Sequence, residues 1–266
     1  MKIKRFILPV LASAVLALQV VGAQAAPAKP ATPPAQSTAA GDGLCRPGTP
    51  DAASPTTDFY DDNFLFGPEQ LPTQAPVGPL LGGYHRFGAL NSGTFLTQYG
   101  NDTTPPTRYV YPPAMGYVIQ YDGLPIKFSQ QLQPGTRIDR FGSPGTGQFL
   151  APLGTPFAQR GLPPSNLNTP TPEMAHEDIV PLANYHVYCV LKPFTVDTGP
   201  IATWFAQPSL GTQYVLNRSY LPQAGSSLSV QWLLDNRFLV EERPPAYADG
   251  YCATAKGASP CPRPRP

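Results

Sequence analysis

The sequence predicts a β-rich α+β fold: a compact sheet, twisted or partly closed and mainly antiparallel, with few helices and an irregular N-terminal segment that caps it. Three observations support this prediction. The 266 residues include 36 prolines and 24 glycines, which favour turns over long helices. From residue 117 onward, short apolar segments with alternating side chains follow one another. Only residues 226–237 have the pattern of a helix.

The first 25 residues have the pattern of a secretory signal peptide. Lysines and an arginine precede an apolar run, and small residues follow at Ala23-Gln24-Ala25. The apolar run is shorter than the roughly 20 residues that a membrane-spanning helix needs, so cleavage is favoured over anchoring. No later segment is apolar enough to cross a bilayer. We therefore expect a protein that is secreted or held at the cell surface.

The mature chain divides by composition into four parts. An Ala/Pro-rich linker covers residues 26–43, and an aromatic segment with many turns, expected to cap the main domain, covers residues 44–116. The main domain is expected at residues 117–243 and a Pro-rich tail at residues 244–266.

The main domain is expected to consist mostly of strands. In residues 185–191 both faces of the alternation are apolar or aromatic, which predicts a strand central to the sheet. The helix at residues 226–237 should begin at a serine cap and bury Leu228, Trp232 and Leu233. The remaining strands are expected at residues 117–121, 125–128, 136–141, 201–207, 212–216 and 238–242.

The four cysteines allow three pairings, and export favours disulfide bonds. Cys252 and Cys261 are close in sequence and could join within the tail, whereas Cys189 lies in a strand and could instead be a small core residue. Two N-glycosylation sequons, which begin at Asn101 and Asn217, suggest surface positions.

Composition and missing motifs exclude several classes of function. A net charge of +1 and 13% charged residues give no support for a nucleic-acid groove or a membrane surface. The chain has no G-x-S-x-G, H-E-x-x-H or P-loop motif, which removes support for a serine hydrolase, a zinc protease or a nucleoside triphosphatase. The acidic residues are scattered, and no carboxylate pair typical of a glycosidase stands out.

Residues 134–216 hold the candidate site. Arg140 and Arg160 lie beside aromatic residues and Gly/Pro-rich turns, where a guanidinium could bind a phosphate or could pair with an acid such as Asp139. Phe141, Phe149 and Trp204 could sandwich a flat ring or fill the core.

Gln213 follows a glycine and lies between β-forming residues. Its amide could bond to the backbone in the core, or could be aimed at a ribose or at developing charge.

Five ordered motifs together resemble the tuberculosis necrotizing toxin (TNT) domain family, whose members are NAD+ glycohydrolases. The motifs are DRFGSP, GQFLAPLGTPFAQRGLPP, YHVYCVLKPF, GPIATWFAQP and GTQYVL. The N-terminal segments GPEQLP and RYVYPPAMGY are more similar to the secreted fungal members than to the bacterial toxins. The resemblance covers residues 60–243.

The resemblance implies roles for individual residues. Gln213 corresponds to the glutamine that turnover requires, and His186 to a histidine of the pocket, although the loop before His186 is longer here than in the toxins. The positions that line the NAD+ pocket in the family correspond to Arg140, Phe141, Phe149 and Arg160. We interpret the two arginines as grips on the pyrophosphate, and the two phenylalanines with Trp204 as packing for nicotinamide and ribose.

The resemblance also implies the reaction: hydrolysis of NAD+ to ADP-ribose and nicotinamide, with NADP+ as a candidate second substrate and no required cofactor. Fungal members carry a calcium site and form homodimers, and Glu241, Glu242 and Asp249 are candidate calcium donors here. Two alternatives remain open. An ADP-ribosyltransferase would commonly use a glutamate where this chain has Gln213. A non-catalytic surface protein could use the same arginines and aromatic residues to bind a ligand.

Overall fold

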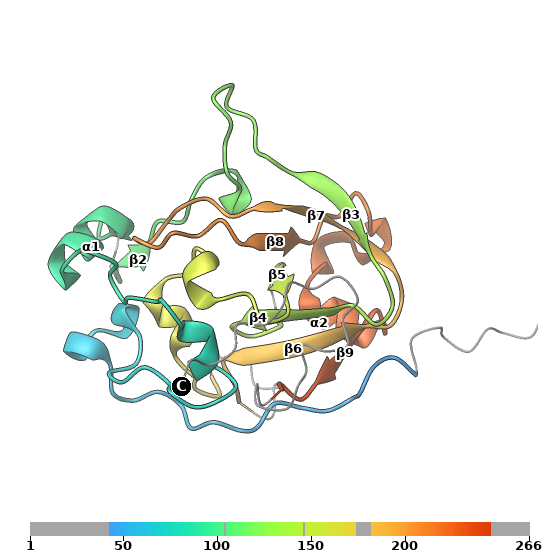
Figure 1. Ribbon diagram of the computed structural model, residues 1–266, viewed down its shortest axis with the longest axis horizontal. Helices are drawn as coiled ribbons and strands as arrows, with labels where there is room; N and C mark the ends of the chain where they lie inside the picture. The colour runs from blue at the N-terminus through green and yellow to red at the C-terminus, as the bar shows by residue number, and fades with distance from the viewer. Residues whose placement is uncertain (1–42, 104, 146, 174–181, 246–266) are drawn as a thin grey trace, which may run out of the picture. The chain divides into compact units, whose positions relative to one another are not determined.

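The computed structural model describes residues 43–103, 105–145, 147–173 and 182–245 (Figure 1). The predicted signal peptide, almost all of the linker and most of the tail, with Cys252, Cys261 and Asp249, lie outside the described residues. Among the residues that the structure describes, no helix is both long enough and apolar enough to span a membrane.

A seven-stranded sheet with the strand order β3-β7-β8-β5-β4-β6-β9 forms the centre of the fold (Figure 1). All of its neighbouring strands pair antiparallel, which confirms the predicted fold class. A small second sheet pairs β1 (Gly100–Asn101) with β2 (Arg108–Tyr109). The strands of the large sheet are β3 (Phe128–Leu132), β4 (Arg137–Phe141), β5 (Phe149–Pro152), β6 (Tyr185–Val190), β7 (Phe194–Pro200), β8 (Thr212–Val215) and β9 (Leu239–Glu242).

Helical structure is short in the described part of the chain. The two α-helices are α1 (Ser92–Tyr99) and α2 (Val230–Asp235). Elsewhere the described chain forms short 3₁₀ helices, some of which have proline in the first turn. These turns are η1 (Tyr60–Asp62), η2 (Phe64–Phe66), η3 (Gly78–Leu81), η4 (Ala114–Gly116), η5 (Phe157–Gln159), η6 (Pro164–Leu167) and η7 (Pro222–Ser227).

The predicted C-terminal helix exists, but it begins later than expected. Its cap is Ser229, whose hydroxyl accepts a hydrogen bond of 3.1 Å from the backbone N–H of Trp232. Leu228 and Leu233 are buried as predicted, whereas Trp232 is only half-buried. The α1 helix was not predicted, because Gly93 and two threonines weaken its helical pattern even though Asn91 caps it.

The predicted strands at residues 117–121 and 125–128 form only isolated bridges before β3 begins at Phe128. The predicted strand at residues 201–207 is also wrong. Only Ile201 makes a β-bridge, and the chain then turns through Phe205 and Ala206, both of which have positive φ. Strand β6 is buried along its whole length, but it lies next to the edge strand β9 rather than at the centre of the sheet. The apolar pattern therefore correctly predicted burial, but it did not determine the strand's place in the sheet.

The main hydrophobic core lies between one face of the sheet and the segment containing η7 and α2. A second, mostly aromatic cluster joins the N-terminal segment to the main domain, because Phe205 packs with Phe66, Phe87 and Phe95. This packing agrees with the prediction that the N-terminal segment caps the main domain. The predicted domain boundaries themselves stay predictions.

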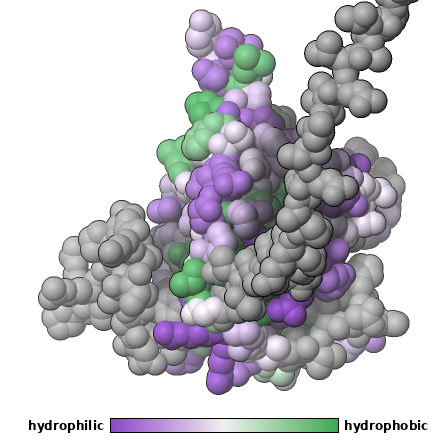
Figure 2. Space-filling view, turned by 90° about the vertical axis from the view of Figure 1, so that its right-hand side faces the viewer, coloured by the Kyte–Doolittle hydropathy of each residue, from purple (hydrophilic) through white to green (hydrophobic). Residues whose placement is uncertain are grey.

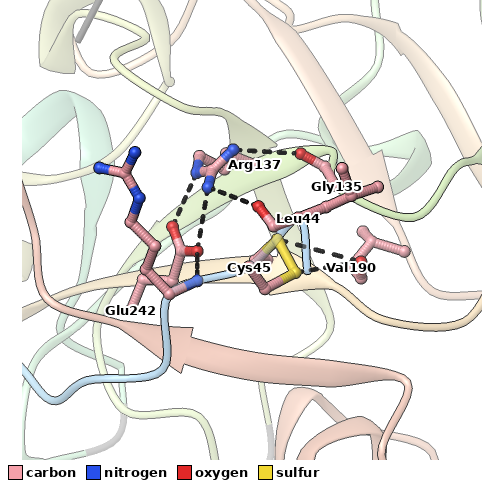
Figure 3. Close-up of polar contacts among 8 residues, drawn as sticks. Leu44, Cys45, Gly135, Arg137, Val190 and Glu242 are labelled. Atoms are coloured by element: carbon pink, nitrogen blue, oxygen red, sulfur yellow. Dashed lines mark hydrogen bonds and ion pairs between the residues drawn. A yellow bond between two sulfur atoms is a disulfide. The ribbon is translucent and has the colours of Figure 1, made fainter. Parts of the chain in front are cut away.

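Cys45 and Cys189 form a disulfide with a Cα–Cα distance of 5.7 Å (Figure 3). Cys189 is therefore both fully buried and cross-linked. Beside the disulfide, Arg137 donates to both oxygens of Glu242 at 2.7 and 3.2 Å and to the carbonyl of Leu44 at 3.0 Å (Figure 3). These contacts attach the start of the described chain to β4, β6 and β9.

Replacing both Cys45 and Cys189 by alanine is expected to lower the free energy of unfolding by about 2–5 kcal/mol, because the disulfide closes a long loop. Urea denaturation followed by circular dichroism measures the change. A reducing agent should destabilise the wild type by a similar amount and the double variant much less. Equal unfolding midpoints for the wild type and the double variant would contradict the prediction.

Candidate functional site

A cavity of about 470 Å³ lies beside β4, β5 and β8 and is closed on one side by the N-terminal segment. Its volume falls within the range of roughly 300–1,000 Å³ that is common for small-molecule sites. The lining residues are Tyr111, Pro112, Met115, Gly116, Asp139, Arg140, Phe141, Phe149, Leu150, Ala151, Arg160, Gly161, Leu162, Asn166, Ile201 and Gln213.

The cavity brings together five of the seven predicted site residues, which are Arg140, Phe141, Phe149, Arg160 and Gln213. His186 and Trp204 are not among the residues that line it. The sequence motifs therefore converge in space, although Gln213 lies far along the chain from the other four.

Arg140 lies where β4 and β5 diverge. These strands pair only at Ile138 and Asp139 of β4. Beyond this point the Arg140 guanidinium connects the two diverging segments. Its Nε donates to the carbonyl of Ser143 at 3.0 Å and its Nη1 to the carbonyl of Phe149 at 2.8 Å. No described residue accepts a hydrogen bond from Nη2. One nitrogen of Arg140 is therefore left for a ligand.

The positive charge of Arg140 persists in this environment. Burial lowers the pKa of the Arg140 guanidinium, while the nearby hydroxyls of Tyr188 and Tyr111 act to raise it. An arginine guanidinium stays protonated at neutral pH in proteins. Arg140 can thus supply a half-buried cation to the cavity.

Arg160 forms a buried ion pair with Asp139, with side chains 4% and 0% exposed. Its Nη1 and Nη2 donate to the two carboxylate oxygens at 2.6 and 2.9 Å, and its Nε donates to the carbonyl of Thr155 at 2.8 Å. The guanidinium carbon lies 5.1 Å from the centre of the Phe141 ring. The partner of Asp139 is therefore Arg160 rather than Arg140, and this geometry favours a role for Arg160 in the cavity wall over a grip on pyrophosphate.

Gln213 projects from β8 and is 7% exposed. Its Nε2 donates to the carbonyl of Met115 at 2.9 Å, and no described residue donates to its Oε1. Ala114 and Met115 both have positive φ in the turn that presents this carbonyl. The two interpretations of Gln213 thus combine: one end of the amide bonds to the backbone, while the residue lines the cavity.

The two phenylalanines differ in their surroundings. Phe141 is 3% exposed and packs against Phe157 and Tyr185, with ring centroids 4.9 Å apart in both cases. Phe149 is 39% exposed and lines the cavity. Phe149 can offer a ring face to a ligand, whereas Phe141 mainly supports the wall.

Trp204 and His186 have structural partners. Trp204 packs in the aromatic cluster of the N-terminal segment and donates from Nε1 to the carbonyl of Val110 at 2.8 Å. The His186 side chain is 1% exposed, and its Nδ1 lies 2.7 Å from Glu241 Oε1. Both residues lie in motifs of the site, but the register and the turns of the chain direct them elsewhere.

Within the described part of the chain, Glu241 and Glu242 do not form an oxygen-rich site, and the third candidate calcium donor, Asp249, lies outside it. Glu241 is paired with His186, and Glu242 accepts from Arg137 and from the backbone N–H of Arg46 at 2.6 Å. One buried group in the described chain combines Glu242 with two cysteines, but these cysteines form the disulfide. Calcium therefore stays a prediction, and we derive no step through a metal.

Sequence reasoning missed Tyr111, Met115 and Asn166, which also line the cavity. Tyr111 and Met115 lie in the motif RYVYPPAMGY, which was used only for the resemblance to fungal proteins. Asn166 lies in the loop that follows AQRGLPP and carries no motif of its own.

A family model described as Tuberculosis necrotizing toxin matches residues 131–241. Residues 131–241 are therefore similar to a TNT domain. The match includes Arg140, Arg160 and Gln213, so the sequence resemblance is confirmed over this part of the chain. The other side of the cavity, which includes Tyr111 and Met115, lies before the matched residues.

A curated relative and two solved structures show further similarity. The chain is 44% identical over 162 residues to the conidial surface nicotinamide adenine dinucleotide glycohydrolase nadA of Aspergillus fumigatus, covering 59% of this chain and 66% of the relative, just under two thirds of its length. The TNT complexed with its immunity factor IFT has a TM-score of 0.44 and 18% identity, over 71% of this chain and 92% of that chain. Tse6 in complex with Tsi6 has a TM-score of 0.23 and 20% identity, over 35% and 66%.

Proposed function

We propose that this protein is a secreted NAD+ glycohydrolase, which cleaves the bond between nicotinamide and ribose in NAD+ or NADP+. The observation that carries the proposal is the single cavity where Arg140, Phe149 and Gln213 meet. The 44% identity to an NAD glycohydrolase of a conidial surface supports the reaction and the location.

The substrate's chemistry fits a cavity without a free carboxylate pair. The nicotinamide ring of NAD+ is a cation and leaves as a neutral molecule with the electrons of the broken bond, so it needs no acid to protonate it. Positive charge develops on the ribose, water adds to its C1′ atom, and the water's second proton passes to solvent. Asp139, the single carboxylate lining the cavity, stays paired with Arg160 throughout.

Arg140, Phe149 and Gln213 then have separate roles in binding and cleavage. The free Nη2 of Arg140 binds a phosphate oxygen, and the exposed ring of Phe149 packs against nicotinamide or ribose. Oε1 of Gln213 orients a ribose hydroxyl or the attacking water, while its Nε2 stays bound to Met115. Positioning and a preorganised polar environment supply most of the rate enhancement.

Cleavage of etheno-NAD+ by the secreted protein tests the proposal. We expect release of nicotinamide and etheno-ADP-ribose in equal amounts, with NADP+ measured in parallel. Transfer of ADP-ribose to added proteins without free ADP-ribose would favour an ADP-ribosyltransferase. Well-folded protein that binds NAD+ without cleaving it would favour a non-catalytic surface protein. Calcium and a chelator are compared in the same assay.

We expect a glycan at Asn101 and none at Asn217 when the protein is secreted from a eukaryotic host. Asn101 is exposed, and no described residue accepts from its Nδ2. Asn217 instead donates from Nδ2 to the buried Asp197 at 3.0 Å. Intact-mass measurement of Asn101→Gln and Asn217→Gln tests this, since only the first should lose mass equal to a glycan. A glycan mass lost in Asn217→Gln would contradict it.

We also propose that the protein is a homodimer that associates through the segment between η4 and β3, which projects from the sheet (Figure 1). Apolar side chains are visible on this projection in Figure 2. Of the twelve exposed large hydrophobic residues in the described chain, four lie in this segment, and a fifth, Phe128, begins β3; the four are Ile119, Tyr121, Leu124 and Ile126. The adjoining β3 is also an edge strand with backbone groups open to pairing.

Replacing Tyr121 and Leu124 by serine is therefore expected to shift the protein towards monomer, because these side chains are 104% and 60% exposed. Size-exclusion chromatography with light scattering measures the mass. Leu210→Ser is a matched control, since Leu210 is 65% exposed outside this segment. A monomeric wild type, or a dimer unaffected by the double change, would contradict the proposed interface.

A further inference from the structure

Asn166 lines the cavity with a side-chain amide that has no protein partner among the described residues. It lies in η6, where Pro163 and Pro164 hold the start of the turn and the backbone N–H of Asn166 donates to the carbonyl of Pro163 at 3.0 Å. The nearby Asn168 differs, because its Nδ2 donates to the carbonyl of Phe64 at 3.0 Å. Asn168 thus has a structural bond, whereas the amide of Asn166 remains available.

The free donors of Asn166 and Arg140 face the same space. Nδ2 of Asn166 and Nη2 of Arg140 each lie 3.8 Å from the position that a Cβ on Gly142 would occupy. Gly142 has a φ of +92°, a conformation that favours glycine, and its lack of a side chain leaves this space open. Two nitrogen donors from different segments therefore flank one small volume at the cavity wall.

The charge around this volume suits an anion. Asp139 compensates the charge of Arg160, so the guanidinium of Arg140 is the remaining cation among the lining residues. A guanidinium nitrogen beside a neutral amide N–H is a favourable environment for phosphate oxygens. A carboxylate in place of the amide would repel the same group.

We infer that Asn166 is a further substrate-binding residue, which together with Nη2 of Arg140 holds the pyrophosphate of the dinucleotide. The identity of the full ligand rests on the proposed function, whereas the recognition of phosphate rests on the two donors alone. Arg160 is then a wall residue, and the phosphate subsite is formed by Arg140 and Asn166.

Isothermal titration calorimetry with ADP-ribose tests the inference through the variants Asn166→Ala and Asn166→Asp. Loss of one hydrogen bond to a charged group should weaken binding roughly tenfold or more in Asn166→Ala. Asn166→Asp should weaken it further, by about a hundredfold, because like charges then meet in a poorly solvated site. Nicotinamide riboside, which has no phosphate, should bind or turn over equally well in the wild type and both variants.

Asn168→Ala is the matched control. It should lower the thermal midpoint without weakening ADP-ribose binding in the folded protein, because Asn168 bonds to the backbone. Equal losses for ADP-ribose and nicotinamide riboside in the Asn166 variants would overturn the inference, as would unchanged binding of both ligands or no binding of ADP-ribose by the wild type.

The same experiment separates this inference from the proposed function. Selective loss of ADP-ribose binding in protein that does not cleave NAD+ would support the phosphate subsite and reject the enzyme. If the protein cleaves NAD+ and Asn166→Asp leaves its KM unchanged, the enzyme is supported and the phosphate subsite is rejected.

Discussion

Gln213→Ala is expected to lower the kcat for NAD+ cleavage by about a hundredfold to a thousandfold and to change KM little. That range is typical when a preorganised polar group is removed from a reacting centre. In the structure the amide is fixed by its bond to the carbonyl of Met115, so it needs no reordering when substrate binds. A loss mainly in kcat would show that Gln213 acts in the transition state rather than in binding.

Steady-state kinetics on Gln213→Ala and Gln213→Glu measure this effect. The glutamate retains the length of the side chain but cannot donate to the Met115 carbonyl when ionised, so we expect it to be impaired as well. Gln207→Ala is the matched control, because Gln207 is buried and also donates to a backbone carbonyl, that of His85, but lies outside the cavity lining. A folded Gln213→Ala with wild-type kcat would remove Gln213 from the mechanism.

Sequence patterns predicted those strands whose side chains alternate strongly. Residues 136–141, 185–191, 212–216 and 238–242 became β4, β6, β8 and β9 within one or two residues. Residues 201–207 have similar composition but form a turn, since their aromatic side chains pack on the N-terminal segment instead of a neighbouring strand. Tertiary packing determines the conformation of residues 201–207, and a local sequence pattern carries no information on that packing.

The candidate site was predictable to the extent that motif residues share a face or a turn. Arg140 and Phe149 meet because a short connection brings the ends of β4 and β5 together. Their roles were less predictable: the pairing of Asp139 with Arg160 depends on the fold of residues 153–160, which no alternation describes. Asn166 was missed for the same reason, since its value lies in an amide left without a partner, a property visible only in three dimensions.

Asp139→Ala is expected to lower the free energy of unfolding by about 3–5 kcal/mol, because it leaves the buried Arg160 guanidinium without its counter-charge. The carboxylate, which is 0% exposed, also accepts hydrogen bonds from the backbone N–H of Gly154 at 2.9 Å and from the hydroxyl of Tyr185 at 2.7 Å. Asp139→Asn should also destabilise the protein. The amide oxygen is a weaker hydrogen-bond acceptor than a carboxylate oxygen, and the amide N–H groups would face the N–H groups of Arg160.

Urea denaturation of Asp139→Ala and Asp139→Asn measures the loss. Asp51→Ala serves as the control, because it removes the exposed ion pair with Arg243 and should leave the unfolding midpoint unchanged. If Asp139→Ala unfolds at the wild-type midpoint, the buried ion pair does not support the cavity wall. If the stability falls as expected, folded Asp139→Asn should also lose activity, because the segment carrying Arg160 forms part of the cavity wall.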